Sequence, residues 1–252
     1  VGGGQGGQAL SLKLKLERID NHLVIDRGPA GAEGPWRTFG RMRTLRTWKT
    51  VTGPDLGIPS LTYQSWFEAQ NGVEAFMRLN KIARESWSDY LHWLRRVLAL
   101  PVEVGTELLG IEPGGEVLRV RVKDAAGERW ILARHVVLAH GIEASGRWTM
   151  PGFVEHLPPG LRAHAADAID FAGLRGRRVA VLGAGASAFD NAAMALEAGA
   201  EVHLFCRRPE LQRVQPYKWL SFPAFFRHFG DLDDAMRWKI MNHVLSLREA
   251  LP

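Results

Sequence analysis

Two short glycine-rich stretches have residue types and a spacing suited to binding a dinucleotide. In the first, Gly2, Gly4 and Gly7 fit the pattern G-x-G-x-x-G, and the second runs from Gly183 to Ala188 as G-A-G-A-S-A. Such a loop lets the backbone turn tightly against a pyrophosphate, and the following helix directs the positive end of its dipole at the anion. A single copy is a weak signal, because glycine-rich stretches are common. Two copies in one chain favour two nucleotide sites.

Each loop is followed, at the same distance, by a residue that would meet the adenosine ribose. Asp26 lies 24 residues after Gly2, and Arg207 lies 24 residues after Gly183. In this fold an acid accepts hydrogen bonds from free ribose hydroxyls, whereas an arginine pairs with a 2′-phosphate. The first site is therefore predicted to take a nucleotide without a 2′-phosphate. The second is predicted to take NADPH, with a preference over NADH of roughly tenfold to hundredfold. Arg208 is a second candidate partner; the alternative is that both arginines form a solvated strand end.

Composition excludes several classes of protein. With 252 residues, 46% hydrophobic and 23% charged, the chain is globular and long enough for one large or two modest domains. The net charge of +5, with basic residues scattered among 27 acidic ones, gives no reason to expect a nucleic-acid partner. The single cysteine, Cys206, excludes an internal disulfide and the redox-active pair of a disulfide reductase. No apolar run approaches the roughly 18 residues of a membrane span and no signal peptide is visible, so we expect a cytoplasmic protein without a membrane partner.

The elements around the first loop predict a compact β-α-β unit. Residues 9–19 have an imperfect helical pattern, and 22–25 resemble a buried parallel strand that ends at Asp26. Only Val1 precedes the loop, where a strand is needed, so we interpret the N-terminus as truncated.

The next part of the chain is rich in glycine, proline, tryptophan and arginine. The stretch 27–70 is too long for a simple connection between two elements, and it suggests irregular segments around a large ligand. Trp36 and Trp48 could lie flat against a ring system, although each taken singly is also an ordinary core residue. Helices are predicted at 62–70, with Thr62 as N-cap, at 76–82 and at 87–97. His92 is interpreted as part of a helix surface and not as a metal ligand, since no second ligand lies at a suitable spacing.

A change to a two-residue period predicts strands after Pro101. They are expected at 102–104, 108–111, 117–122 and 130–132, as a small β-meander with turns at 114–115 and 126–127. A buried strand is predicted at 135–139, followed by a linker. The second unit then reads as strand 178–182, the second loop, helix 189–198 and strand 201–206, with further elements at 212–220, 222–229 and 233–247.

The order of these motifs resembles the class B flavoprotein monooxygenases, which include flavin-containing monooxygenases, Baeyer-Villiger enzymes and lysine/ornithine N-hydroxylases. The shared features are the first loop, an acidic strand end, a late V-V-L-A-x-G-like strand, a P-G-F linker and a second loop with its arginine. The resemblance implies an α/β fold with two Rossmann-like, three-layer dinucleotide-binding units, the second inserted in the first. It implies an FAD-binding domain at 1–150 and an incomplete NADPH-binding domain at 151–252. It also implies that more chain follows, so that this is a fragment. We therefore expect the 252 residues alone to hold FAD too weakly for stoichiometric flavin to survive purification.

Some positions depart from the family pattern. Gly160 and His164 keep the G-x-x-x-H spacing, but Pro158 and Ala168 stand where aromatic residues are expected, and His140 replaces a threonine. Lys49 is a candidate cation near the flavin, with an ordinary surface lysine as the alternative. The candidate cofactor-binding residues are Gly2, Gly4, Gly7, Asp26, Arg27, Trp36, Gly141, His164, Gly183, Gly185, Ser187, Ala188, Arg207 and Arg208; no metal ligand is predicted.

The resemblance implies that NADPH reduces FAD and that one oxygen atom of O2 enters a small organic substrate through a flavin hydroperoxide. The cofactor supplies most of that chemistry, so no side-chain nucleophile is required. Two alternatives remain open. One is an NAD(P)H-dependent flavoprotein reductase or oxidase that does not oxygenate a substrate, and the other is a non-catalytic nucleotide-binding fragment.

Overall fold

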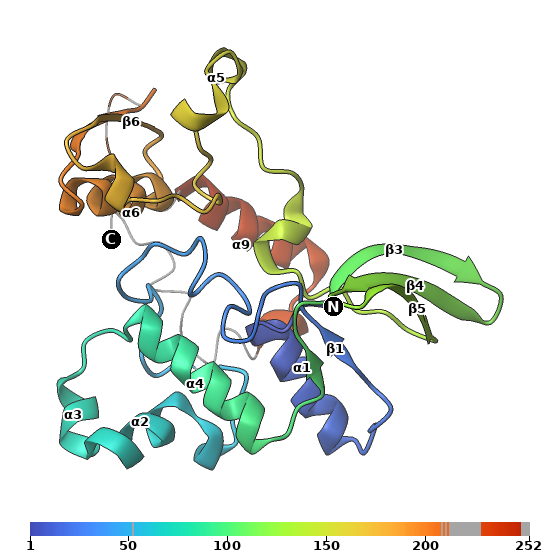
Figure 1. Ribbon diagram of the computed structural model, residues 1–252. Helices are drawn as coiled ribbons and strands as arrows, with labels where there is room; N and C mark the ends of the chain where they lie inside the picture. Colours follow the sequence, from blue (N-terminus) through green and yellow to red (C-terminus); the bar gives the residue numbers. More distant parts are fainter. Residues whose placement is uncertain (52, 208, 210, 212–227, 248–252) are drawn as a thin grey trace. The chain divides into compact units, whose positions relative to one another are not determined.

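The structure is a computed structural model that describes residues 1–51, 53–207, 209, 211 and 228–247. It divides into two compact units. The first comprises Val1–Thr38, Thr52–Arg78 and Glu85–Trp148, and the second comprises Phe39–Val51, Leu79–Arg84 and Thr149–Pro252. Each unit combines helices with a pair of parallel strands, which confirms the predicted α/β class (Figure 1). The element predicted at 212–220, most of that at 222–229 and the side chain of Arg208 lie outside the described residues.

The first unit begins with the glycine loop and the helix α1 (Gln5–Leu16), which buries Gly7, Gln8, Ser11 and Leu12. Strand β1 (Val24–Ile25) follows and pairs in parallel with β2 (Val102–Glu103). The prediction of a buried parallel strand before Asp26 is confirmed, although only two of its four residues form a ladder. The assignment of 102–104 to the meander was wrong, because a two-residue strand has no alternation that could reveal its partner.

Three helices and a short turn of 3-10 helix build most of the core of this unit. They are η1 (Pro59–Leu61), α2 (Tyr63–Asn71), α3 (Val73–Arg78) and α4 (Arg84–Val97). The hydroxyl of Thr62 accepts the N–H of Ser65 and begins α2, as predicted. The buried side of α4 carries Trp87 and Tyr90, whose rings contact that of Tyr63. Burial and the nearby carboxylate of Asp55 raise the pKa of Tyr90.

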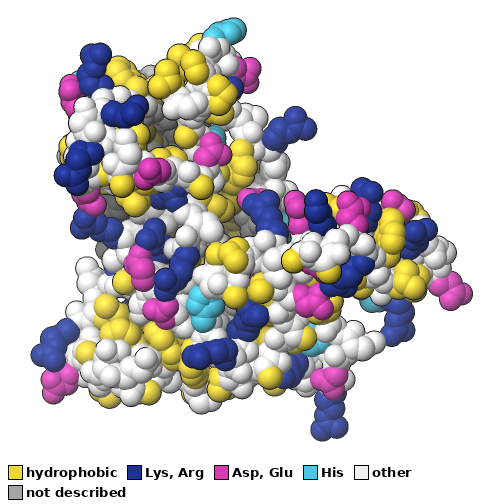
Figure 2. Space-filling model, in the orientation of Figure 1, with side chains coloured by type: hydrophobic (Ala, Val, Ile, Leu, Met, Phe, Trp, Pro, Cys, Tyr) yellow, Lys and Arg dark blue, Asp and Glu magenta, His cyan; other side chains and the backbone are white. Residues whose placement is uncertain are grey.

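The predicted β-meander consists of β3 (Glu107–Gly114), β4 (Val117–Asp124) and β5 (Gly127–Ala133), joined as antiparallel neighbours (Figure 1). Val120 and Val122 point to one side and form a core with Ile25. The alternate residues of β4, Arg119 and Lys123, face acidic partners on the adjacent strands. Basic and acidic side chains are accordingly interspersed over the meander (Figure 2).

The buried strand predicted at 135–139 is not present. These residues have no assigned strand, and Val137 and Leu138 are each 52% exposed. Their backbone contacts are with Val1, which donates to the carbonyl oxygen of Val137 at 2.7 Å and accepts the N–H of Ala139 at 2.7 Å. One residue provides too few hydrogen bonds for a ladder, although the contact places this segment beside the glycine loop. Its last residues lead into η2 (Gly141–Ser145).

The second unit contains a complete β-α-β motif. Strand β6 (Arg178–Leu182) leads through the second glycine loop into α6 (Ala186–Glu197), and β7 (Glu201–Phe205) pairs in parallel with β6. Gly199, at φ +93°, follows the end of α6, where a glycine commonly ends a helix. The remaining elements are α5 (Gly152–Glu155), η3 (Pro159–Leu161), η4 (Ala172–Leu174), η5 (Phe229–Asp231) and α9 (Asp234–Leu247).

The segment 39–51, which belongs to the second unit, is linked to helix α6 by two arginines. Arg46 pairs with Asp190 of α6 at 2.9 Å, and both side chains are mostly buried, with exposures of 23% and 12%. Arg43 pairs with Glu197 at the end of the same helix, but there both side chains are largely exposed. The segment 39–51 therefore presents one buried and one exposed ion pair to α6.

We expect Asp190→Asn to lower the free energy of unfolding by about 1 to 3 kcal/mol, because it removes the mostly buried ion pair between Arg46 and Asp190. Glu197→Gln removes the exposed pair and is expected to leave the free energy of unfolding nearly unchanged, because water and salt screen that pair. Urea denaturation of both variants checks this. Equal losses in the two variants would contradict the ranking by burial.

Candidate nucleotide-binding sites

The first glycine loop is held in a conformation that only glycine fits. Gly2 has φ +108°, and its N–H donates to the carbonyl oxygen of Ile25 at 2.8 Å. A Cβ on Gly2 would overlap the carbonyl oxygen of Ala139, and a Cβ on Gly7 would overlap the carbonyl oxygen of Gly2. The loop is therefore folded closely on itself, and its backbone can approach a ligand without intervening side chains.

The carboxylate of Asp26 lies directly against this loop. Its Oδ2 accepts the N–H of Gly3 at 2.7 Å, and its Oδ1 accepts the N–H of Gly28, also at 2.7 Å. Each carboxylate oxygen can accept more than one hydrogen bond, so the half-buried group can still receive ribose hydroxyls. The neighbouring Arg27 points elsewhere and pairs with Glu143 of η2 at 2.6 Å. Arg27 therefore has a local acidic partner, which the sequence did not reveal.

The start of α1 offers backbone donors to an anion. Gly4 is the N-cap and has no side chain with which to cap the first turn. Gln8 is only 1% exposed; its Nε2 donates to the carbonyl oxygen of Gly3 at 3.1 Å, and its Oε1 has no partner among the described residues. The uncapped helix start and the close-packed glycines fit a pyrophosphate. We had not predicted Gln8, although its place directly after the third glycine is a usable signal.

A loop without helix or strand covers one side of the glycine loop. The Cα of Gly34 lies 3.5 Å from the position of a Cβ on Gly4. Trp36, half-buried, contacts the ring of Trp87 edge-on with centroids 6.3 Å apart, and its Nε1 is buried without a partner among the described residues. A Cβ on Gly34 would lie 3.5 Å from the Nε1 of Trp36 and 3.6 Å from the Cα of Gly4, so Trp36 lies near the first loop, and its contact with a cofactor stays a prediction. Trp48 is 48% exposed and belongs to the segment 39–51.

The second glycine loop has the same design. Gly183 has φ +134°, its N–H donates to the carbonyl oxygen of Phe205 at 2.8 Å, and a Cβ on it would lie 3.4 Å from the Cβ of Ala188. Gly185 is the N-cap of α6 and, like Gly4, provides no side-chain cap. Ser187, in the first turn of α6, is exposed. Backbone N–H groups at this helix start can therefore bind a second phosphate.

A pocket of about 800 Å³ joins this loop to the predicted ribose arginine. Its walls include Gly183 and Ala184 from the loop, Cys206 and Arg207 from the end of β7, and Phe153 from α5. The space is large enough for part of a dinucleotide. The structure thus brings together the second loop and Arg207, which sequence reasoning had paired through their spacing alone.

The other predicted site residues have varied surroundings. Gly141 has φ +60° and begins η2. His164 accepts the N–H of Ala166 at its Nδ1, at 3.1 Å, so it shapes a local turn. Lys49 is half-buried within the segment 39–51, which belongs to the second unit. Its role beside a flavin stays a prediction.

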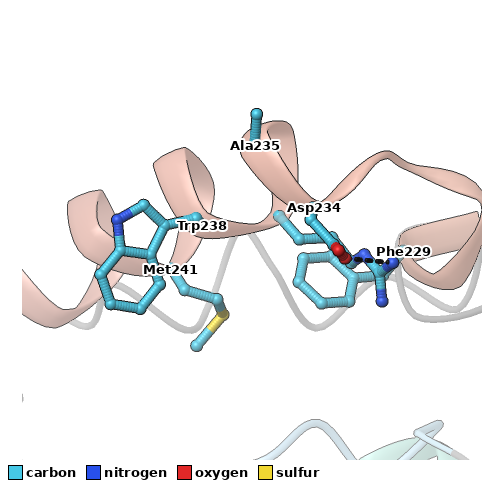
Figure 3. A pocket seen from close by; sticks show the side chains of 6 residues that line it. Phe229, Asp234, Ala235, Trp238 and Met241 are labelled. Atoms are coloured by element: carbon cyan, nitrogen blue, oxygen red, sulfur yellow. Dashed lines mark ion pairs between the residues drawn. The ribbon is translucent and has the colours of Figure 1, made fainter.

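A second pocket, of about 590 Å³, lies along α9. Figure 3 shows Phe229, Trp238 and Met241 projecting to one side of the helix, while Ala235 points away from them. The polar groups at its edge, Asp234 and Arg237, pair with each other at 2.7 Å. In the part of the chain that the structure describes, no cluster of three or more acidic, histidine or cysteine side chains could hold a metal ion. Nor does any described helix combine the length and apolar character needed to cross a bilayer.

Comparison with known proteins identifies the family. A sequence model described as pyridine nucleotide-disulphide oxidoreductase matches residues 1–229, which include both glycine loops. The chain belongs to this family. Among curated proteins, the FAD-dependent urate hydroxylase of Xanthomonas campestris pv. campestris is 44% identical over 243 residues, which are 96% of this chain and 51% of that protein. The chain thus spans about half the length of the curated relative it matches.

Solved structures resemble this family member in fold. The reduced ornithine hydroxylase of Pseudomonas aeruginosa has a TM-score of 0.69 at 18% identity, covering 99% of this chain and 64% of that one. The L-lysine 6-monooxygenase of Pseudomonas syringae has a TM-score of 0.63 at 18% identity, with coverage of 98% and 62%. A flavin-containing monooxygenase of Stenotrophomonas maltophilia has 0.57 at 21% identity, with coverage of 100% and 68%. These likenesses confirm the predicted resemblance to flavin monooxygenases at the level of the fold.

Proposed function

We propose that the protein is an FAD- and NADPH-dependent monooxygenase that inserts one oxygen atom from O2 into a small organic molecule. The 44% identity with the FAD-dependent urate hydroxylase carries this proposal, because the matched region makes up 96% of the chain. Urate, or a similar small heterocycle, is accordingly the first substrate to test. The single cysteine supports an oxygenase over a disulfide reductase, since these 252 residues hold no cysteine pair.

The first unit is assigned to FAD. Gly2, Gly4 and Gly7 would admit the pyrophosphate, the first turn of α1 would donate backbone hydrogen bonds to it, and Asp26 would accept ribose hydroxyls. The contact of Asp26 with Gly3 supports this role, because it places the carboxylate beside the loop. FAD, when bound, supplies the redox and oxygen chemistry, and the protein binds, orients and shields it from water.

The second unit is assigned to NADPH. Gly183 and Gly185 would face the pyrophosphate, and Arg207, with Arg208 as a second candidate, would pair with the 2′-phosphate. The shared pocket of Gly183 and Arg207 supports this assignment. Lys49 and His164 are retained as candidate cofactor contacts.

Reduction and oxygenation can be tested separately. The FAD-loaded protein is mixed with NADPH or NADH without oxygen, and flavin absorbance is followed; we expect reduction by NADPH at about ten times the efficiency of NADH, or more. Labelled oxygen is then added with urate, and one labelled atom is expected in the organic product. Recovery of all the oxygen as hydrogen peroxide would contradict a urate monooxygenase and favour the alternative of an oxidase or reductase.

A further inference from the structure

We propose that Glu33 is a positioning residue for the nucleotide of the first unit, because it fixes the segment 31–36 against the first glycine loop. The inference rests on the proposed function in one respect, namely that this loop binds FAD. The polar partners of the Glu33 carboxylate are Gly31, His92 and Arg95, which lie outside the loop. Glu33 acts through the backbone on either side of the loop, and it was not among the residues predicted from the sequence.

The carboxylate of Glu33 is buried in a site built from charged and polar partners. Its side chain is 2% exposed and forms an ion pair with Arg95 of α4. Its Oε2 accepts the N–H of Gly31 at 2.9 Å and lies 3.1 Å from the Nε2 of His92. A carboxylate this deeply buried requires such partners to offset the loss of water. His92 and Arg95, from successive turns of α4, therefore hold Glu33 of the irregular segment in place.

Segment 31–36 has few means of its own to hold its shape. It contains no helix or strand, and Gly31 and Gly34 have positive φ angles of +92° and +74°. Backbone of this kind has a large conformational entropy to lose on folding. The segment nevertheless lies against the glycine loop, with the Cα of Gly34 at 3.5 Å from the position of a Cβ on Gly4. Its position must come from tertiary contacts, and Glu33 supplies charged ones.

Arg95 extends this link to the other side of the loop. While one of its nitrogens pairs with Glu33, its Nη2 donates to the carbonyl oxygen of Val102 at 3.0 Å. Val102 belongs to β2, and its Cγ1 lies 3.1 Å from the position of a Cβ on Gly3. The pair of Glu33 and Arg95 thus joins the segment beside Gly4 to the strand beside Gly3. These two neighbours of the loop are therefore held by one side-chain pair, whose arginine lies on α4.

The residue directly after the segment, Arg37, provides a matched control on the same helix. Arg37 pairs with Asp89 of α4 at 2.5 Å, but the two side chains are 43% and 54% exposed. Exposed pairs of this kind contribute little, because water and salt screen them. Asp89→Asn therefore removes a carboxylate that links α4 to the residue next to the segment, without removing the buried pair of Glu33 and Arg95.

The test compares Glu33→Gln with Asp89→Asn in the chain without nucleotide. Amide hydrogen exchange of residues 2–8, relative to that of residues 87–94, is expected to rise about tenfold or more in Glu33→Gln and to stay unchanged in Asp89→Asn. The FAD dissociation constant, measured by flavin fluorescence, is expected to rise by a similar factor. If Glu33→Gln does not fold, His92→Gln is used, and the same direction with a smaller change is expected.

A lower melting temperature in Glu33→Gln with unchanged relative exchange at residues 2–8 would overturn the proposal, since that is what a merely structural residue would show. Exchange does not depend on which nucleotide binds. Faster exchange in Glu33→Gln, together with no FAD binding by the unchanged chain, would support the positioning role and contradict the proposed FAD site. Failure of the positioning role of Glu33 and failure of the proposed FAD site therefore give different results.

Discussion

Gly7→Ala is expected to raise the dissociation constant for FAD at least about 100-fold and to destabilise the first unit. The added Cβ would overlap the carbonyl oxygen of Gly2 and lie 3.0 Å from its carbonyl carbon. Both clashes are with backbone that cannot rotate away, and Gly7 is buried. Either the loop opens or α1 shifts, and both changes remove the backbone donors from the anion. Fluorescence titration with FAD measures the loss.

Gly6→Ala is the matched control. Gly6 lies one residue earlier in the same helical turn, is exposed, and has nothing within 4 Å of an added Cβ. Alanine there improves helix propensity by about 1 kcal/mol and leaves the loop unchanged. We therefore expect normal FAD affinity and equal or slightly higher stability. Unchanged FAD binding in Gly7→Ala, or equal loss in both variants, would show that the close approach of Gly7 to Gly2 does not govern the site.

Arg207→Gln is expected to weaken binding of NADP⁺ by roughly tenfold to hundredfold while the affinity for NAD⁺ stays the same. The reason is that the guanidinium pairs with the 2′-phosphate, which only NADP⁺ carries. Arg207 is exposed and lines the pocket that contains Gly183, so the substitution removes a charge without creating a cavity. Isothermal calorimetry with both nucleotides measures the preference.

Arg178→Gln controls for the loss of a positive charge. Arg178 is exposed and begins β6, at the opposite end of this strand from Gly183. We expect no change of preference in this variant. An unchanged ratio of NADP⁺ to NAD⁺ affinity in Arg207→Gln would contradict its assignment, as would the same fall in Arg178→Gln.

Local signals were sufficient to predict most regular elements. Thr62 begins α2 because its hydroxyl can cap a free N–H, and the glycines of the meander mark turns where a positive φ is needed, as at Gly115 and Gly127. The two dinucleotide loops were also recognisable from their glycines, because positions such as Gly2 and Gly183 need a positive φ. Their spacing to Asp26 and Arg207 also gave the correct neighbours, because a β-α-β motif fixes where its second strand ends.

Features that depend on distant contacts were not predicted. The parallel pairing of Val24 with Val102 joins residues 78 positions apart, and a two-residue strand has no periodic signal. Glu33 lies in a glycine- and proline-rich segment that suggests solvent exposure, and its burial depends on His92 and Arg95 from another part of the chain. The segment 39–51 gave no sign that its arginines pair with α6. Such contacts follow from the tertiary fold, which local propensity does not specify.

A double titration with FAD and NADP⁺ tests the central claim, that one chain holds two nucleotide sites of different preference, most directly. FAD is titrated by fluorescence with and without saturating NADP⁺, in the unchanged chain, Gly7→Ala and Arg207→Gln. The account predicts that the two ligands bind together, that Gly7→Ala loses FAD alone, and that Arg207→Gln loses affinity for NADP⁺ alone. Competition of the two nucleotides for one site would contradict it.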